Sequence, residues 1–114
     1  MYAITFDLDI ETLKSTYHND SYNNAYTDIR NTLEEFGFSR QQGSVYFGNN
    51  NVDAVACVLA TQELTSRYDW FSVSVKDIRM LRIEDNNDLG PAIKRATANS
   101  EKKNQSNESR APLH

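Results

Sequence analysis

Apolar and polar side chains alternate along the first nine residues of the chain. The apolar positions are Tyr2, Ile4, Phe6 and Leu8, and the residues between them are Ala3, Thr5, Asp7 and Asp9. A period of two predicts a β-strand, in which successive side chains point to opposite faces. We therefore expect Asp7 and Asp9 to lie together near the end of this strand, on the face opposite the apolar one.

Helical periods follow in two longer segments. Apolar residues recur every three or four positions across residues 22–36 and again across residues 52–68, which predicts two amphipathic helices. Gly37 follows the first of them and is typical of a helix C-terminus. A shorter helical segment is expected at residues 10–17, directly after the first strand.

The remaining regular segments read as strands. Residues 38–41 and 44–47 are short extended stretches around Gly43, which predicts a hairpin. Residues 73–84 are rich in β-branched and apolar side chains and predict a last strand. Its alternation shifts phase near Asp77, which indicates a bulge or a late start of the strand.

The order of these elements predicts an α+β fold. Strand, helix, two strands, helix and strand form the ferredoxin-like βαββαβ pattern, with two helices on one face of an antiparallel sheet. The last strand is apolar on both faces, with Ile78 and Met80 on one and Leu81 and Ile83 on the other. We therefore expect the other face of the sheet to form a homodimer interface, with pairing through strand edges as the alternative geometry.

The chain is expected to contain one domain and a tail. Residues 1–93 form the predicted ferredoxin-like domain, since a chain of 114 residues has room for a single core. Residues 94–114 are polar and mildly basic, with five Lys and Arg against two Asp and Glu. Almost no large apolar side chain occurs there, so we expect a disordered C-terminal tail.

Charge and cysteine content narrow the function classes. Residues 1–93 hold seven Lys and Arg against fourteen Asp and Glu, and such an acidic body argues against a protein that coats nucleic acid. The one cysteine, Cys57, cannot form an intramolecular disulfide, and it is expected to be a packing residue. The start of the chain does not resemble a signal peptide, and no apolar run reaches the ~18 residues of a membrane span. We expect a cytoplasmic protein with no membrane partner.

Asp7 and Asp9 are the candidate chemical groups. Two carboxylates at one strand end, approached by a second pair in a dimer, require protons, basic partners or a divalent cation. Mg²⁺ fits such oxygen ligands and can assist phosphodiester cleavage. Arg79 is a candidate to neutralise this cluster or to bind phosphate, with an interface salt bridge as the alternative. Two Asp residues at a strand end are more often a solvated rim or a hydrogen-bonded loop anchor than a catalytic pair.

Four segments carry a resemblance to a known family. MYAITFDLD, AYTDIRNTLEEFGF, QQGSVYFGN and DWFSVSVKDIRMLRIEDNNDL occur in that order across residues 1 to about 93. Together they resemble the virulence-associated protein D (VapD) family. That family is similar to the small CRISPR-associated endonucleases of spacer acquisition, which are ferredoxin-like dimers with an Asp at the end of the first strand. Asp7 occupies the matching position here.

The resemblance implies a function and a set of site residues. It implies an endoribonuclease that acts on single-stranded RNA or mRNA, in some cases as the toxin of a toxin–antitoxin pair with a small antitoxin partner. Asp7 would be catalytic, and Ser44 and Tyr46 would lie near the cleaved phosphate, with Ser44 as a second catalytic residue and Tyr46 contacting the RNA. From the residues themselves we expect Asp7 to bind the metal or to polarise the nucleophile, and Ser44 and Arg79 to orient the phosphate. Asp9 as a second metal ligand is an expectation from this sequence alone, and the chain beyond Lys94 extends past the usual end of the family.

Two other functions fit the same fold. A non-catalytic homodimeric interaction module is consistent with the acidic body and with the absence of a basic groove. An acylphosphatase-like hydrolase would need an anion-binding loop after the first strand. The sequence DIETLKS at that place offers carboxylates where such a loop needs glycines and Arg.

Overall fold

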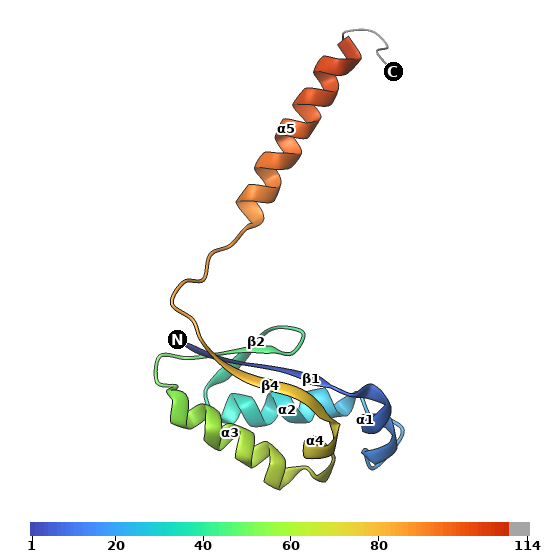
Figure 1. Cartoon of the computed structure of the whole chain (residues 1–114), viewed down its shortest axis with the longest axis vertical. Coiled ribbons are helices and arrows are strands. Elements are labelled where there is room, and N and C mark those ends of the chain that lie inside the picture. Colours follow the sequence, from blue (N-terminus) through green and yellow to red (C-terminus); the bar gives the residue numbers. More distant parts are fainter. Residues whose placement is uncertain (110–114) are drawn as a thin grey trace. The chain divides into compact units, whose positions relative to one another are not determined.

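A computed structural model describes residues 1–109 of the chain. It contains two compact units, Met1–Glu84 and a second unit from Asp85 onward, each described here by itself. The strands are β1 (Tyr2–Leu8), β2 (Phe38–Gln42), β3 (Val45–Gly48) and β4 (Val75–Arg82), and the helices are α1 (Ile10–Thr16), α2 (Asn24–Glu35), α3 (Ala54–Arg67), α4 (Asp69–Ser74) and α5 (Gly90–Ser109) (Figure 1). No helix among the described residues is long and apolar enough to cross a bilayer.

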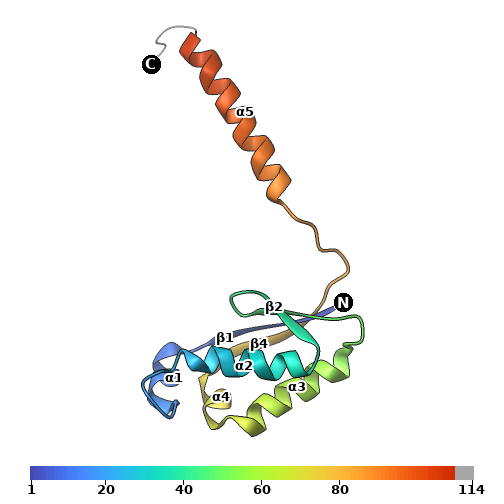
Figure 2. The ribbon, with the colours of Figure 1, turned by 180° about the vertical axis from the view of Figure 1, so that it is seen from behind.

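The first unit confirms the predicted ferredoxin-like architecture. Its four strands form one antiparallel sheet in the order β2-β3-β1-β4. Helices α2 and α3 cover the same face of this sheet, as views from opposite sides show (Figures 1 and 2). No helix of this unit covers the other face, which we call the open face.

The core lies between the sheet and the helices. Ile4 of β1 is paired with Tyr46 on one side and with Met80 on the other, and directly paired residues share a face of the sheet. Ile4 and Phe6 are buried against Leu33 of α2 and the other residues of one continuous cluster. The periodic apolar residues of the sequence therefore form the core, as expected.

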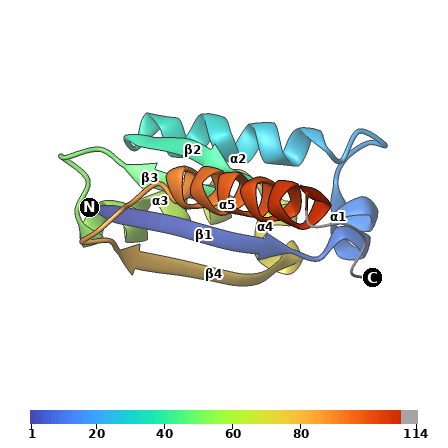
Figure 3. The same cartoon turned by 90° about the horizontal axis from the view of Figure 1, so that it is seen from above.

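The phase shift predicted near Asp77 is confirmed as a β-bulge. Asp7 is paired with Asp77, but Leu8 is paired with Val75, so Lys76 has no partner residue on β1. Bulges are common beside active sites, where they redirect a side chain. This bulge lies at the same end of the sheet as Asp7, and β1 and β4 run side by side up to it (Figure 3).

The start of the last strand differs from the prediction. Val73 and Ser74 belong to α4, and β4 begins at Val75. Helix α4 is only six residues long, and it buries Trp70, Phe71 and Ser74. Burial of these side chains favours the helix over the extended conformation suggested by local β-propensity.

The C-terminal segment contains a helix. The first compact unit ends at Glu84, and residues 90–109 form the helix α5, whereas the sequence analysis placed the domain boundary at residue 93 and a disordered tail after it. Side chains 91–103 are exposed, so burial does not explain this helix. The segment is instead rich in Ala, Lys and Glu, which have high helix propensity and offset part of the ordering entropy. Residues 110–114 of the predicted tail lie outside the described residues.

Candidate functional site

Asp7 lies at the charged end of the open face. It is exposed and directly opposite Asp77 of β4, while Thr5, two residues earlier, is opposite Arg79. On its other side β1 pairs with β3 only as far as Thr5. Asp7 therefore extends past the start of β3, where the hairpin has already turned away.

Arg79 compensates the charge of one of the two facing carboxylates. Its Nε lies 3.1 Å from both carboxylate oxygens of Asp77, and this contact raises the pKa of Arg79. No ion pair or side-chain hydrogen bond involves Asp7 among the residues whose side chains the structure describes. Asp7 is thus an acceptor available to a substrate. Arg79, opposite Thr5, belongs to the next residue pair on the same face.

The hairpin turn brings Ser44 next to the end of β1. The Phe6 backbone N–H donates to the Ser44 carbonyl oxygen at 3.2 Å, which places the half-buried Ser44 opposite Phe6, the residue before Asp7. Tyr26 of α2 approaches the same place. Burial raises the pKa of Tyr26, and the negative charge of Asp7 raises it further. The structure therefore places Asp7 and Arg79 on the open face, whereas Ser44 and Tyr26, a residue absent from the sequence prediction, lie with Tyr46 on the other side of the strand end.

Tyr46 lies on the other face of the sheet. It is paired with Ile4, only 2% of its surface is exposed, and its ring centroid is 6.0 Å from that of Phe6. The expectation that Tyr46 contacts RNA beside Asp7 does not match this placement. The hairpin residues Val45 and Tyr46 point to opposite faces, and an isolated four-residue strand does not tell which of them enters the core.

Asp9 caps a helix instead of extending the carboxylate pair. Strand β1 ends at Leu8, and the Thr12 backbone N–H donates to Asp9 Oδ1 at 2.9 Å. This bond holds the pKa of Asp9 below its usual value. The Asp9 N–H also donates to the Ser74 carbonyl oxygen at 2.7 Å. The strand alternation used to place Asp7 and Asp9 on one face therefore stops before Asp9.

Removal of this cap is expected to lower the melting temperature. Because the pKa of Asp9 is lowered in the folded state, its carboxylate stabilises the protein at neutral pH, and the effect is lost as pH falls below 3.8. Asp9→Ala should therefore melt below the wild type at pH 7, with a gap that shrinks in acid. Asp9→Asn keeps a capping side chain and should retain most of the stability and the activity. Thermal unfolding monitored by circular dichroism measures both variants; strong loss of activity in Asp9→Asn would instead favour a metal ligand.

Lys76 is the second residue that the sequence analysis missed. It is the unpaired, exposed residue of the β4 bulge, and its charge contributes to the low pKa of Asp9. It therefore adds a cation to the end of the sheet that holds Asp7. The phase shift near Asp77 was the sequence signal for this position, because a bulge residue is displaced from the regular alternation.

No metal centre is complete within one described chain. Among residues whose side chains the structure describes, no three His, Cys, Asp or Glu side chains come close enough to share an ion. Mg²⁺ often takes only one or two protein carboxylates and completes its shell with water and substrate phosphate. Asp7 fits such a site, with Asp77 across the strand pair, whereas Asp9 is engaged by Thr12.

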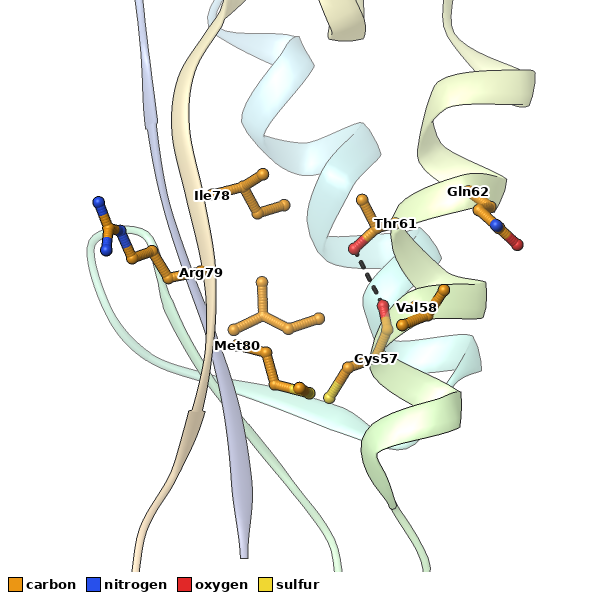
Figure 4. A pocket seen from close by; sticks show the side chains of 8 residues that line it. Cys57, Val58, Thr61, Gln62, Ile78, Arg79 and Met80 are labelled. Atoms are coloured by element: carbon orange, nitrogen blue, oxygen red, sulfur yellow. Dashed lines mark hydrogen bonds between the residues drawn. The ribbon is translucent and has the colours of Figure 1, made fainter.

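A separate apolar pocket lies between β4 and α3. Its volume is ≈ 220 Å³, and Ile4, Cys57, Val58, Thr61 and Met80 contribute to its lining (Figure 4). The Arg79 side chain points away from it, toward the open face (Figure 4). Burial raises the pKa of the Cys57 thiol, so the reactive thiolate is disfavoured there. This pocket offers neither a nucleophile nor a cation for phosphate chemistry.

Comparisons with known proteins identify the family of the chain. The family model for CRISPR associated protein Cas2 matches residues 1–89. The chain is 55% identical over 93 residues to Endoribonuclease VapD 2 of Riemerella anatipestifer, which covers 82% of this chain and 99% of that protein. It is 53% identical over 94 residues to an Endoribonuclease VapD homolog of Helicobacter pylori, with 82% and 97% covered. Endoribonuclease VapD of Dichelobacter nodosus is 44% identical over 96 residues, with 84% and 100% covered. The whole of α5 lies beyond the region that the family model matches, and the chain belongs to the VapD group of the Cas2 family.

Proposed function

We propose that this protein is an endoribonuclease that cleaves single-stranded RNA, including mRNA, at the Asp7 end of the open face. Its relatives carry the name endoribonuclease. The observation that carries the proposal is the exposed Asp7 carboxylate, which has no ion pair among the described side chains, with Arg79 and Lys76 at the same end of the sheet and Ser44 across the strand end. A carboxylate next to hydroxyl and cationic groups suits phosphodiester cleavage, in which charge develops on oxygen.

The proposed chemistry assigns a task to each residue. An oxygen nucleophile, either water or the ribose 2′-hydroxyl, attacks phosphorus; it loses a proton, and the bond from phosphorus to the leaving oxygen breaks as that oxygen gains a proton. Asp7 accepts the proton of the nucleophile or orients it. Ser44 donates a hydrogen bond to the phosphate, and Arg79 and Lys76 stabilise the negative charge. Tyr26 of α2 borders the site on the side of the sheet that the helices cover.

We include Mg²⁺ in the proposal. Asp7 would hold it, with Asp77 as the second carboxylate on the same face. When bound, the ion would lower the pKa of a coordinated water and neutralise phosphate charge. Asp77 is hydrogen-bonded to Arg79, so Asp7 is the stronger of the two ligands.

Homodimer formation through the open face is part of the proposed function. Phe47, Ala3 and Leu81 form one row across the sheet, and Leu81 is 44% exposed. An apolar row on a sheet face that no helix of its unit covers is typical of an interface between copies. A small antitoxin that blocks the Asp7 end is the partner we propose for cellular control.

Leu81→Lys should convert the dimer to a monomer. The charge would lie in the centre of an apolar interface, where an unpaired cation is strongly disfavoured. Val73→Lys is the matched control, because Val73 is 57% exposed on α4 and away from the open face. Light scattering after size exclusion gives both masses. A dimer that survives Leu81→Lys would contradict pairing through this face and favour strand edges.

A non-catalytic interaction module is the second candidate. It is favoured by Val55, Val58 and Leu59 of α3, which are half or more exposed at helical spacing. Such a stripe fits a partner protein. It offers no group that cleaves RNA.

Cleavage of end-labelled RNA separates the two functions. Single-stranded RNA, duplex RNA and single-stranded DNA of one sequence should be incubated with the wild type, with Mg²⁺ or with EDTA. The proposal expects cutting of single-stranded RNA, with EDTA lanes reporting on the metal. Uncut RNA in every lane would favour the interaction module. Cyclic phosphate ends on the products would identify the 2′-hydroxyl as nucleophile, and 5′-phosphate ends would identify water.

A further inference from the structure

We infer that a second pocket, between α2 and the β2–β3 hairpin, binds the phosphate and ribose of an RNA nucleotide next to the cleaved bond. Its lining includes Tyr26, Thr27, Arg30, Arg40, Ser44 and Tyr46. The nucleic-acid identity of the ligand rests on the proposed function, whereas the affinity of the pocket for phosphate rests on its own side chains.

The pocket is large enough for part of a nucleotide. Its volume is ≈ 310 Å³, which lies at the lower end of the range of about 300–1,000 Å³ found for small-molecule sites. Unlike the apolar pocket beside α3, it contains two Arg side chains and several hydroxyl groups. A site of this composition fits an anionic sugar phosphate.

Arg40 is the main candidate for phosphate binding. Its Nε donates to the Gly43 carbonyl oxygen at 2.9 Å, which holds the guanidinium over the hairpin turn. No carboxylate lies within ion-pair distance of Arg40 among the described side chains. Five of the other six Lys and Arg side chains of Met1–Glu84 have such a carboxylate, and Lys76 is the exception. The Nη groups of Arg40 are thus free for a phosphate, which Arg binds in a bidentate manner.

Arg30 adds a second guanidinium from α2. Its Nε lies 2.9 Å from Glu34 Oε1, one helical turn away. This contact uses one edge of the guanidinium and fixes the side chain on the helix surface. Arg30 and Arg40 both line the pocket, and the charge of each favours a lower pKa for the Tyr46 hydroxyl.

The Tyr46 hydroxyl supports the assignment. Burial raises the pKa of Tyr46, while Arg40 and Arg30 act in the opposite direction. No hydrogen bond to another side chain or to backbone involves this hydroxyl, yet no buried side-chain polar atom lacks a partner in the part of the chain that the structure describes. Solvent must therefore reach the Tyr46 hydroxyl through the pocket, where it can donate to a bound phosphate.

The pocket adjoins the Asp7 end through shared residues. Ser44 and Tyr26 line it; the Ser44 carbonyl is bonded to the N–H of Phe6, the residue before Asp7, and the charge of Asp7 raises the pKa of Tyr26. An RNA strand with its cleaved phosphate at Asp7 would therefore pass Ser44 and place a neighbouring nucleotide near Arg40. This path runs around the C-terminal end of β1. It connects Asp7 on the open face with the pocket side chains on the other face.

Arg40→Gln tests the pocket by RNA binding. We expect the Kd of a fluorescent single-stranded RNA, measured by anisotropy, to rise about tenfold on loss of one charge-assisted contact. The slope of log K against log salt should fall by about 0.7, the value for one phosphate contact on a single strand. Arg30→Gln should act in the same direction, and Arg40→Lys should keep part of the affinity. Arg82→Gln is the matched control, since it removes an exposed charge at the far end of β4 and should bind like the wild type.

The result separates the pocket from the proposed function. Unchanged Kd and salt slope in Arg40→Gln would overturn the pocket assignment, even if the wild type cleaves RNA. Equal weakening in Arg82→Gln would also overturn it, because the effect would then be one of net charge. If the wild type binds RNA through Arg40 but cuts none, the pocket assignment stands and the endoribonuclease proposal fails.

Discussion

Asp7→Asn should reduce RNA cleavage by about a hundredfold or more, because it removes a carboxylate that acts on the nucleophile or binds the metal. Asn has nearly the same shape and keeps an oxygen acceptor. Asp7 is exposed, faces Asp77 and has no side-chain partner among the described residues, so the folded part of the chain that the structure describes loses no contact in this variant. The melting temperature should therefore stay the same or rise slightly as repulsion from Asp77 is removed.

The matched control for this variant is Asp20→Asn. Asp20 is exposed in the loop between α1 and α2, so the substitution changes the charge equally and leaves the site alone. Initial rates on end-labelled single-stranded RNA, from proteins purified in parallel, give the comparison. Equal cleavage by Asp7→Asn and Asp20→Asn would show either a contaminating nuclease or a site elsewhere, and both would remove the proposed role of Asp7.

Trp70→Ala should lower the free energy of unfolding by about 3–5 kcal/mol, the usual cost of removing a large buried aromatic side chain. Trp70 is 2% exposed, and its ring lies 4.9 Å from that of Tyr68 and 5.5 Å from that of Tyr17, between centroids. It therefore joins α4 to α1 and to the end of α3. Urea unfolding monitored by circular dichroism measures the loss.

The position of α4 links this stability effect to the site. Ser74, at the end of α4, accepts the hydrogen bond from the Asp9 N–H, directly after β1. Loss of Trp70 should therefore also loosen the strand end that holds Asp7. Ser72→Ala is the control, since Ser72 is exposed on the same helix. A loss below about 1 kcal/mol in Trp70→Ala would contradict the packing described for α4.

The parts of the fold that the sequence predicted correctly are those with a clear local period. The alternation from Tyr2 to Leu8 gave β1, and the three-to-four spacing in residues 22–36 and 52–68 gave α2 and α3. The phase shift near Asp77 gave the bulge. In each case the period reflects the buried face of the element, so the pattern and the structure have the same cause.

The parts that were wrong depend on tertiary contacts or on a choice that no period encodes. Helix α4 is too short to show a helical period, and it forms because Trp70 and Phe71 are buried. Asp9 continues the alternation of β1 in sequence, but its side chain satisfies Thr12 at the start of α1. Helix α5 needs no burial, so an argument from missing apolar residues does not exclude it.

The candidate site was only partly accessible from sequence. Asp7 and Arg79, both predicted from the sequence, lie on the open face at one end of the sheet, and Ser44 lies across the strand end on the other face. Tyr26, Arg30 and Arg40 were not predicted, because they come from α2 and β2 and meet Ser44 only when the hairpin packs against α2. Exposed arginines on separate elements give no sequence signal of their proximity.

The measurement that tests the central claim most directly is an NMR titration of ¹⁵N-labelled Asp7→Asn protein with single-stranded RNA, which this variant should bind without cutting. The account predicts the largest amide shifts at Thr5, Ser44, Lys76 and Arg79, with further shifts at Arg40 in the hairpin. Shifts confined to α3 and the apolar pocket beside it, with none around residue 7, would contradict RNA binding at this end of the sheet and favour the interaction module.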